Sequence, residues 1–134
     1  MSRRPRILCV DDRQESLLVR KMLLEQFGCD VTVVADARAC LHAATHDEVD
    51  LVVIDYHLAE GPKGDELAKD IRAHRPQMPL IMLTGDPAIP ETAQASVDAV
   101  LIKGTSNPSD LLATIQKLLP NATVRQPRDP INIA

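Results

Sequence analysis

Acidic, hydroxyl and amino side chains follow directly after short apolar runs at several points of the 134-residue sequence. These residues are Asp11, Asp12, Asp55, Thr84 and Lys103. Carboxylate ligands without His or Cys among them favour a hard cation such as Mg²⁺. A carboxylate whose charge is balanced by a cation can attack a phosphoryl group, while an ammonium and a hydroxyl group stabilise the phosphoryl oxygens. The set predicts phosphoryl-transfer chemistry if the fold brings these residues together.

The apolar runs themselves predict the elements that position this set. They are short, rich in β-branched residues and not alternating, as is typical of strands buried on both faces of a parallel sheet. The five runs are 7–10, 31–34, 51–54, 80–83 and 99–102. Because segments with helical periodicity separate them, we predict an α/β fold with a doubly wound five-stranded parallel sheet.

Several residues indicate where the helices begin and end. Asp12 is a candidate N-cap of the first helix, and Gly28 is a stop signal at its end. Asp36 is expected to cap the second helix, and Asn107 the last one. The segment 90–97 predicts only a short helix, because it is brief and consists mostly of small residues.

Ligands of open parallel sheets bind beyond the carboxyl ends of the strands, where the winding changes direction. If the strand order is 2-1-3-4-5, the first and third strands are neighbours, about 5 Å apart, and Asp11, Asp12 and Asp55 converge on one pocket. Simpler roles remain open for single members. Asp12 could serve only as a helix cap, Thr84 could belong to an ordinary turn, and Lys103 could form a structural salt bridge with Asp55.

Composition and charge argue against several classes of partner. The formal net charge is −4, and the aromatic side chains are one Phe and one Tyr, without Trp. Such a chain lacks both the basic surface and the stacking platform that nucleic acids require, so we expect no direct nucleic-acid or membrane partner. The first apolar run is too short for a signal peptide, which predicts a cytoplasmic protein. Cys9, Cys29 and Cys40 match no metal or redox motif and are expected to be buried free thiols.

Four segments together resemble a response-regulator receiver domain of two-component signalling, over about residues 5–119. They are 7–12, 52–58, 81–85 and 100–103. The resemblance implies the (βα)5 flavodoxin-like fold with strand order 2-1-3-4-5. It implies that Asp55 is the phosphoacceptor, and that Asp11, Asp12, Asp55 and the backbone carbonyl of His57 hold Mg²⁺ directly or through water. Thr84 and Lys103 would sense and clamp the phosphoryl group.

The resemblance also implies a function for the whole chain. A receiver domain would span residues 1–119 and a flexible tail residues 120–134. The protein would be a single-domain response regulator that takes a phosphoryl group from a sensor histidine kinase or a histidine phosphotransfer protein and signals through a downstream protein. Slow self-dephosphorylation is compatible with this function, and turnover of an external substrate is not expected. The alternative is a receiver-like interaction module whose binding does not depend on phosphorylation.

The sequence departs from the receiver pattern at four places near the carboxyl ends of the strands. Val100 stands where receivers usually have Tyr or Phe, and Gly104 stands where they usually have Pro, so we expect a trans bond there. The interval from Thr84 to Lys103 is short by roughly one helical turn, about 3.6 residues. The loop 57–64 has one extra residue. We therefore expect an intact phosphorylation site beside a modified signalling surface.

Overall fold

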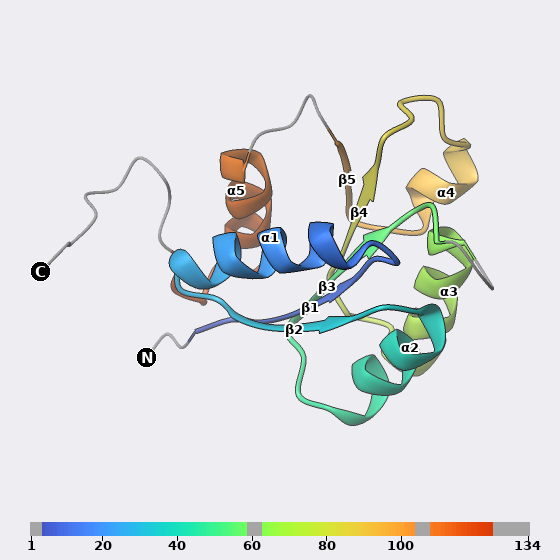
Figure 1. Ribbon diagram of the computed structural model, residues 1–134. Helices are drawn as coiled ribbons and strands as arrows, with labels where there is room; N and C mark the ends of the chain where they lie inside the picture. Colours follow the sequence, from blue (N-terminus) through green and yellow to red (C-terminus); the bar gives the residue numbers. More distant parts are fainter. Residues whose placement is uncertain (1–3, 59–62, 104–107, 125–134) are drawn as a thin grey trace, which may run out of the picture.

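Five strands form one parallel sheet. The computed structural model describes residues 4–58, 63–103 and 108–124 (Figure 1). The strands are β1 (Arg6–Val10), β2 (Asp30–Val34), β3 (Leu51–Asp55), β4 (Leu80–Thr84) and β5 (Ala99–Ile102). Their order is β2-β1-β3-β4-β5. The predicted fold class and strand order are confirmed, and every predicted strand agrees with the observed one to within one residue at each end.

Helices cover both faces of this sheet. They are α1 (Gln14–Gln26), α2 (Ala37–His46), α3 (Gly64–His74), α4 (Glu91–Ala95) and α5 (Pro108–Leu118). Figure 1 shows α1 and α5 on one face and α2, α3 and α4 on the other. The short helix predicted within 90–97 is confirmed as α4, which has five residues. Among the described residues, no helix combines the length and the apolar character that crossing a bilayer would need.

The side chains of β1 show how the sheet separates two hydrophobic cores. Leu8 and Val10 lie in the core on the side of α2 and α3. Ile7 and Cys9 lie in the core on the side of α1 and α5. Because both faces of the strand are buried, successive residues must all be apolar, which explains the uninterrupted apolar run in the sequence.

The helix boundaries confirm two of the predicted signals and correct a third. The carboxylate of Asp36 accepts a hydrogen bond from the backbone N–H of Ala39 at 2.8 Å, which caps α2 as predicted. Gly28 adopts a φ of 95° just after α1, a conformation that glycine tolerates best. The prediction that Asp12 caps α1 was wrong. The N-cap residue is Arg13, and its backbone N–H donates to the carboxylate of Asp11 instead.

The segment after α5 packs against the domain. Val124 is buried in the core on the side of α1 and α5. The Gln116 side chain holds this segment, because its Nε2 donates to the carbonyls of Leu119 and Ala122 and its Oε1 accepts from the N–H of Val124. Residues 120–124 thus differ from the flexible tail expected over 120–134, since a buried apolar side chain and two of these hydrogen bonds hold them.

The three cysteines are free and buried, as predicted. Burial raises the pKa of Cys9 and Cys40 to about 12 and that of Cys29 to about 11. Reactive thiols have a lowered pKa and partial exposure, so these three thiols pack as small apolar groups.

Other predictions concern residues outside the described part of the chain. The cap at Asn107, the trans bond at Gly104, the extra residue of the loop 57–64 and the end of the tail depend on residues 59–62, 104–107 and 125–134.

Candidate functional site

Two buried carboxylates lie side by side at the carboxyl ends of β1 and β3. Val10 pairs with Ile54 in the parallel register, so the next residues along the two strands, Asp11 and Asp55, become neighbours. Asp11 is fully buried and Asp55 is 3% exposed, whereas Asp12 is exposed. One carboxylate oxygen from each of the three residues lies within 4.8 Å of the others. The predicted convergence of three carboxylates is therefore present.

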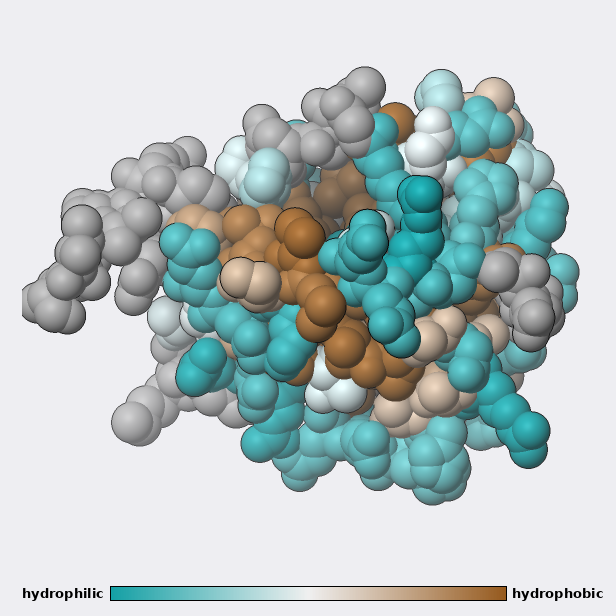
Figure 2. Space-filling view, in the orientation of Figure 1, coloured by the Kyte–Doolittle hydropathy of each residue, from teal (hydrophilic) through white to brown (hydrophobic). Residues whose placement is uncertain are grey.

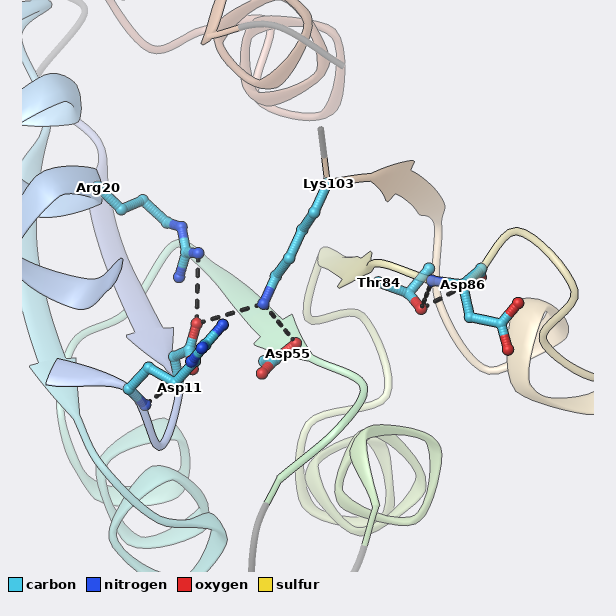
Figure 3. A network of polar contacts seen from close by, with 7 residues as sticks. Asp11, Arg20, Asp55, Thr84, Asp86 and Lys103 are labelled. Carbon is cyan, nitrogen blue, oxygen red and sulfur yellow. Dashed lines mark hydrogen bonds and ion pairs between the residues drawn. The ribbon is translucent and has the colours of Figure 1, made fainter. Parts of the chain in front are cut away.

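Lys103 completes this arrangement from the end of β5. Its Nζ lies 2.9 Å from Oδ1 of Asp55 and 3.5 Å from Oδ2 of Asp11 (Figure 3). The backbone N–H of Lys103 donates to the carbonyl of Thr84 at 2.7 Å, which extends the β4–β5 pairing to the lysine. A side chain that starts two strands away from Asp55 is thereby directed to it. We call Asp11, Asp12, Asp55 and Lys103 the acidic corner.

Asp11 has further partners on the side of α1. Its Oδ1 accepts the backbone N–H of Arg13 at 3.0 Å, and its Oδ2 lies 3.4 Å from Nη2 of Arg20. The sequence prediction missed Arg20. Its spacing could have identified it as part of the site, because Arg20 shares the inward face of α1 with the buried Leu17 and Leu24. A basic residue on such a face needs a partner.

The surroundings shift the pKa values of the two buried carboxyl groups in opposite directions. Burial raises the pKa of Asp55, and the negative charge of Asp11 raises it further, against the opposing effect of Lys103. Burial also opposes ionisation of Asp11. The hydrogen bond from Arg13 and the charges of Lys103 and Arg20 outweigh this and hold its pKa below the ordinary value. Protonation or a cation at the corner relieves the repulsion between the two carboxylates.

The hydroxyl group of Thr84 is engaged elsewhere. Thr84 is fully buried at the end of β4. Its Oγ1 donates to the backbone carbonyl of Asp86 and accepts the backbone N–H of the same residue, at 3.2 and 3.0 Å. In Figure 3 the Thr84 side chain lies beside Asp86, apart from the contact between Asp55 and Lys103. The structure thus brings Thr84 to the same edge of the sheet, but its hydroxyl group bonds to Asp86 and to no side chain of the acidic corner.

The chain leaving β3 passes very close to the start of α3. The N–H of Gly64 donates to the carbonyl of Tyr56 at 3.0 Å. A Cβ at Gly64 would lie 2.8 Å from the carbonyl oxygen of Asp55 and from Cα of Tyr56. Glycine is therefore required for this contact, which holds the backbone that carries Asp55. His57 is exposed just beyond, and its ring packs edge-on against Tyr56.

The donor atoms of the acidic corner fit a magnesium ion. Mg²⁺ prefers oxygen ligands and usually retains several waters, so one or two carboxylates suffice to bind it. Asp11, Asp12 and Asp55 supply oxygens only, and the exposure of Asp12 keeps one side of the group open to water. The chemistry of the residues present is thus consistent with this ion.

Known proteins share both the sequence pattern and the fold. The family model of the response regulator receiver domain matches residues 7–116. A sensor protein, GacS, from Pseudomonas syringae is 35% identical over 88 residues, and the sensor histidine kinase GacS from Pseudomonas protegens is 36% identical over 88 residues. Each match covers 62% of this chain and 10% of the relative, so the chain spans about a tenth of their length.

Solved structures agree over most of the chain. A CheY-like receiver domain protein from Methanospirillum hungatei is 34% identical with a TM-score of 0.78, over 88% of this chain and 96% of that one. The response regulator TrrA from Thermotoga maritima, solved in complex with Mg(2+)-BeF, is 25% identical with a TM-score of 0.80, over 85% and 98%. With its strand order, its acidic corner and a family match over most of its length, the chain belongs to the response regulator receiver domain family.

Proposed function

We propose that this protein is a response regulator that accepts a phosphoryl group on Asp55. The observation that carries this proposal is the contact between Asp55 and Lys103 at 2.9 Å within a group of three carboxylates. Asp55 is buried except for 3% of its surface, and its pKa is raised by burial. Such a carboxylate is a better nucleophile than its exposed counterparts when a cation keeps it ionised.

The reaction transfers a phosphoryl group from nitrogen to oxygen. A carboxylate oxygen of Asp55 forms a bond to phosphorus as the bond from phosphorus to the imidazole nitrogen of the donor histidine breaks. The nitrogen keeps the electron pair and takes up a proton from solvent. Lys103 neutralises charge on the transferred oxygens, because its Nζ already lies beside Oδ1 of Asp55.

Asp11, Asp12, Asp55 and the backbone carbonyl of His57 would hold Mg²⁺. When bound, the ion supplies positive charge that offsets the negative charge of the phosphoryl oxygens. The related response regulator from Thermotoga maritima was solved in complex with Mg(2+)-BeF, which supports a metal-dependent reaction for this chain. Thr84 would contribute its hydroxyl only after its two hydrogen bonds to Asp86 open.

The phosphoryl donor would be a sensor histidine kinase or a histidine phosphotransfer protein. Receiver domains interact with such proteins, and of the matched relatives one is a sensor histidine kinase and one a sensor protein. An exposed apolar patch on α1, formed by Leu18, Val19 and Met22, supports a protein partner on this side. Figure 2 shows hydrophobic surface over α1. Hydrophilic groups lie beside it, near the start of this helix and the carboxyl end of β1. The phosphorylated form would then signal to a second protein in the cytoplasm.

A second candidate function is that of an interaction module that binds a partner protein independently of phosphorylation. It is favoured by the engaged hydroxyl of Thr84 and by Val100 in place of an aromatic switch residue. A partner recovered with the wild type would then bind Asp55→Asn equally well. Binding that changes with the phosphorylation of Asp55 would reject this candidate.

Incubation with acetyl phosphate and Mg²⁺, followed by intact mass measurement, tests the first function. We expect the wild type to gain the mass of one phosphoryl group and Asp55→Asn to gain none. Chelation of the metal should prevent the gain in the wild type. No gain in the wild type, or an equal gain in Asp55→Asn, would contradict the proposal.

A further inference from the structure

A second basic side chain reaches the acidic corner from α1. Arg20 places Nη2 at 3.4 Å from Oδ2 of Asp11, and its side chain is only 11% exposed (Figure 3). It is distinct from Lys103, which approaches from β5 on the other side of the same carboxylate. Neither the resemblance nor the proposed phosphoryl transfer requires a basic residue at this position.

Two cations share a single oxygen of Asp11. Oδ2 lies 3.4 Å from Arg20 and 3.5 Å from Lys103, while Oδ1 accepts the N–H of Arg13. Asp11 is also fully buried, so water does not compete for either oxygen. A metal ion that uses Asp11 must therefore take an oxygen that already has a protein partner.

The contact of Arg20 with Asp11 lacks the geometry of a strong ion pair. It is a single long contact rather than the two-pronged pairing that makes arginine and carboxylate pairs strong. The other terminal nitrogen, Nη1, is buried and has no hydrogen-bond partner among the described residues. The guanidinium group can thus move away from Asp11, but its charge stays near any ion that replaces it.

We propose that Arg20 is a positioning residue that competes with Mg²⁺ for Asp11 and so lowers the affinity of the corner for the ion. The inference rests on the proposed function, because it assumes that Asp11 binds the metal. Arg20 neutralises part of the charge of the carboxylates when the ion is absent and repels the ion when it approaches. Removing this charge should therefore favour the metal-bound form.

Calorimetric titration of the unphosphorylated protein with MgCl₂ tests this inference. Arg20→Gln and Arg20→Met, which keeps an unbranched stem, should bind Mg²⁺ about three- to tenfold more tightly than the wild type. Arg20→Lys keeps the charge and should stay near the wild type. Lys21→Gln is the matched control, because it removes the same charge from the adjacent position, where the lysine pairs with Glu25.

The dependence on salt separates electrostatic competition from a structural effect. The gain in affinity should shrink as ionic strength rises, since salt screens the repulsion between Arg20 and the ion. Unchanged or weaker binding in folded Arg20→Gln and Arg20→Met would overturn the inference and leave the proposed function standing. An equal gain in Lys21→Gln would also overturn it. If neither the wild type nor any variant binds Mg²⁺, the metal-dependent function fails together with the inference.

Discussion

Two regions at the carboxyl ends of the strands differ in whether their side chains already have the contacts that the proposed phosphoryl transfer needs. At the acidic corner the carboxylates and Lys103 are already in contact, with Lys103 at 2.9 Å from Asp55. On what we call the β4–β5 side, formed by Thr84, Asp86, Val100 and α4, the hydroxyl group is tied to Asp86 and α4 has only five residues. Val100 is half-buried against the apolar core and has no ring to rotate.

We infer from this difference that, in the proposed function, accepting a phosphoryl group and reporting it to a partner would depend on different parts of the fold. The acidic corner is formed by β1, β3 and one lysine, whereas in the proposed function a response would require β4 and α4 to rearrange. Thr84 and Lys103 link the two regions through the hydrogen bond between their backbones. Substitutions on one side should therefore have effects that stay confined to that side.

The largest effect is expected for Lys103→Met. Loss of the cation beside Asp55 removes a preorganised charge from the transferred oxygens, so labelling by acetyl phosphate should slow about a hundredfold. Rates of mass gain measure this, with Lys69→Met on α3 as the control. A wild-type rate in Lys103→Met would show that the lysine serves only as a structural ion pair.

Gly64→Ala should destabilise the fold, while Gly85→Ala should not. A Cβ at Gly64 would lie 2.8 Å from the carbonyl oxygen of Asp55 and from Cα of Tyr56, whereas one at Gly85 meets nothing within 4 Å. We expect Gly64→Ala to lower the free energy of unfolding by about 1–3 kcal/mol. Thermal unfolding compares the two variants. Equal melting temperatures would contradict the close approach of α3 to β3.

Asp55→Asn should stabilise the fold at neutral pH. The pKa of Asp55 is raised in the folded state by burial first and by Asp11 as well, so the folded protein binds its proton more tightly than the unfolded chain. Stability is therefore lost as pH rises from the ordinary value of 3.8 through the raised one, and Asn avoids this loss.

Denaturant unfolding of the wild type and Asp55→Asn at several pH values measures the difference. It should be largest near neutral pH and disappear below the ordinary carboxyl pKa, where Asp55 is protonated in both states. A difference that does not change with pH would assign the effect to packing rather than to charge.

The smallest effect is expected for Val100→Tyr. Val100 belongs to the β4–β5 side, so an added ring should leave the rate of labelling on Asp55 within about twofold of the wild type, a small change in barrier height. The same acetyl phosphate assay applies. A tenfold change in either direction would show that the two regions are coupled before any partner binds.

The periodicity of the sequence was sufficient to predict the strands, whereas their order came from the resemblance to receiver domains. Apolar runs buried on both faces have few alternatives in a small α/β domain, and the residue after each run falls at the same edge of the sheet. The convergence of Asp11, Asp55 and Lys103 follows from this topology alone. Their roles in phosphoryl transfer remain predictions.

The details that the sequence did not predict depend on which hydrogen-bond partner each buried polar side chain has. Asp12 was expected to cap α1, but the fully buried Asp11 needs partners and takes the N–H of Arg13. The same need explains the contact with Arg20. Thr84 turned towards Asp86 because a buried hydroxyl group bonds the nearest backbone groups. Such competition among partners is not visible in a pattern of apolar and polar residues.

The central claim is that Asp55, among three neighbouring carboxylates, is the residue that accepts the phosphoryl group. Borohydride reduction converts an aspartyl phosphate to homoserine, so peptide mass mapping after treatment with acetyl phosphate and Mg²⁺ locates the acceptor. We predict homoserine at position 55 and unchanged Asp11 and Asp12. Homoserine at position 11 or 12, or at no position in a folded wild type, would contradict the account.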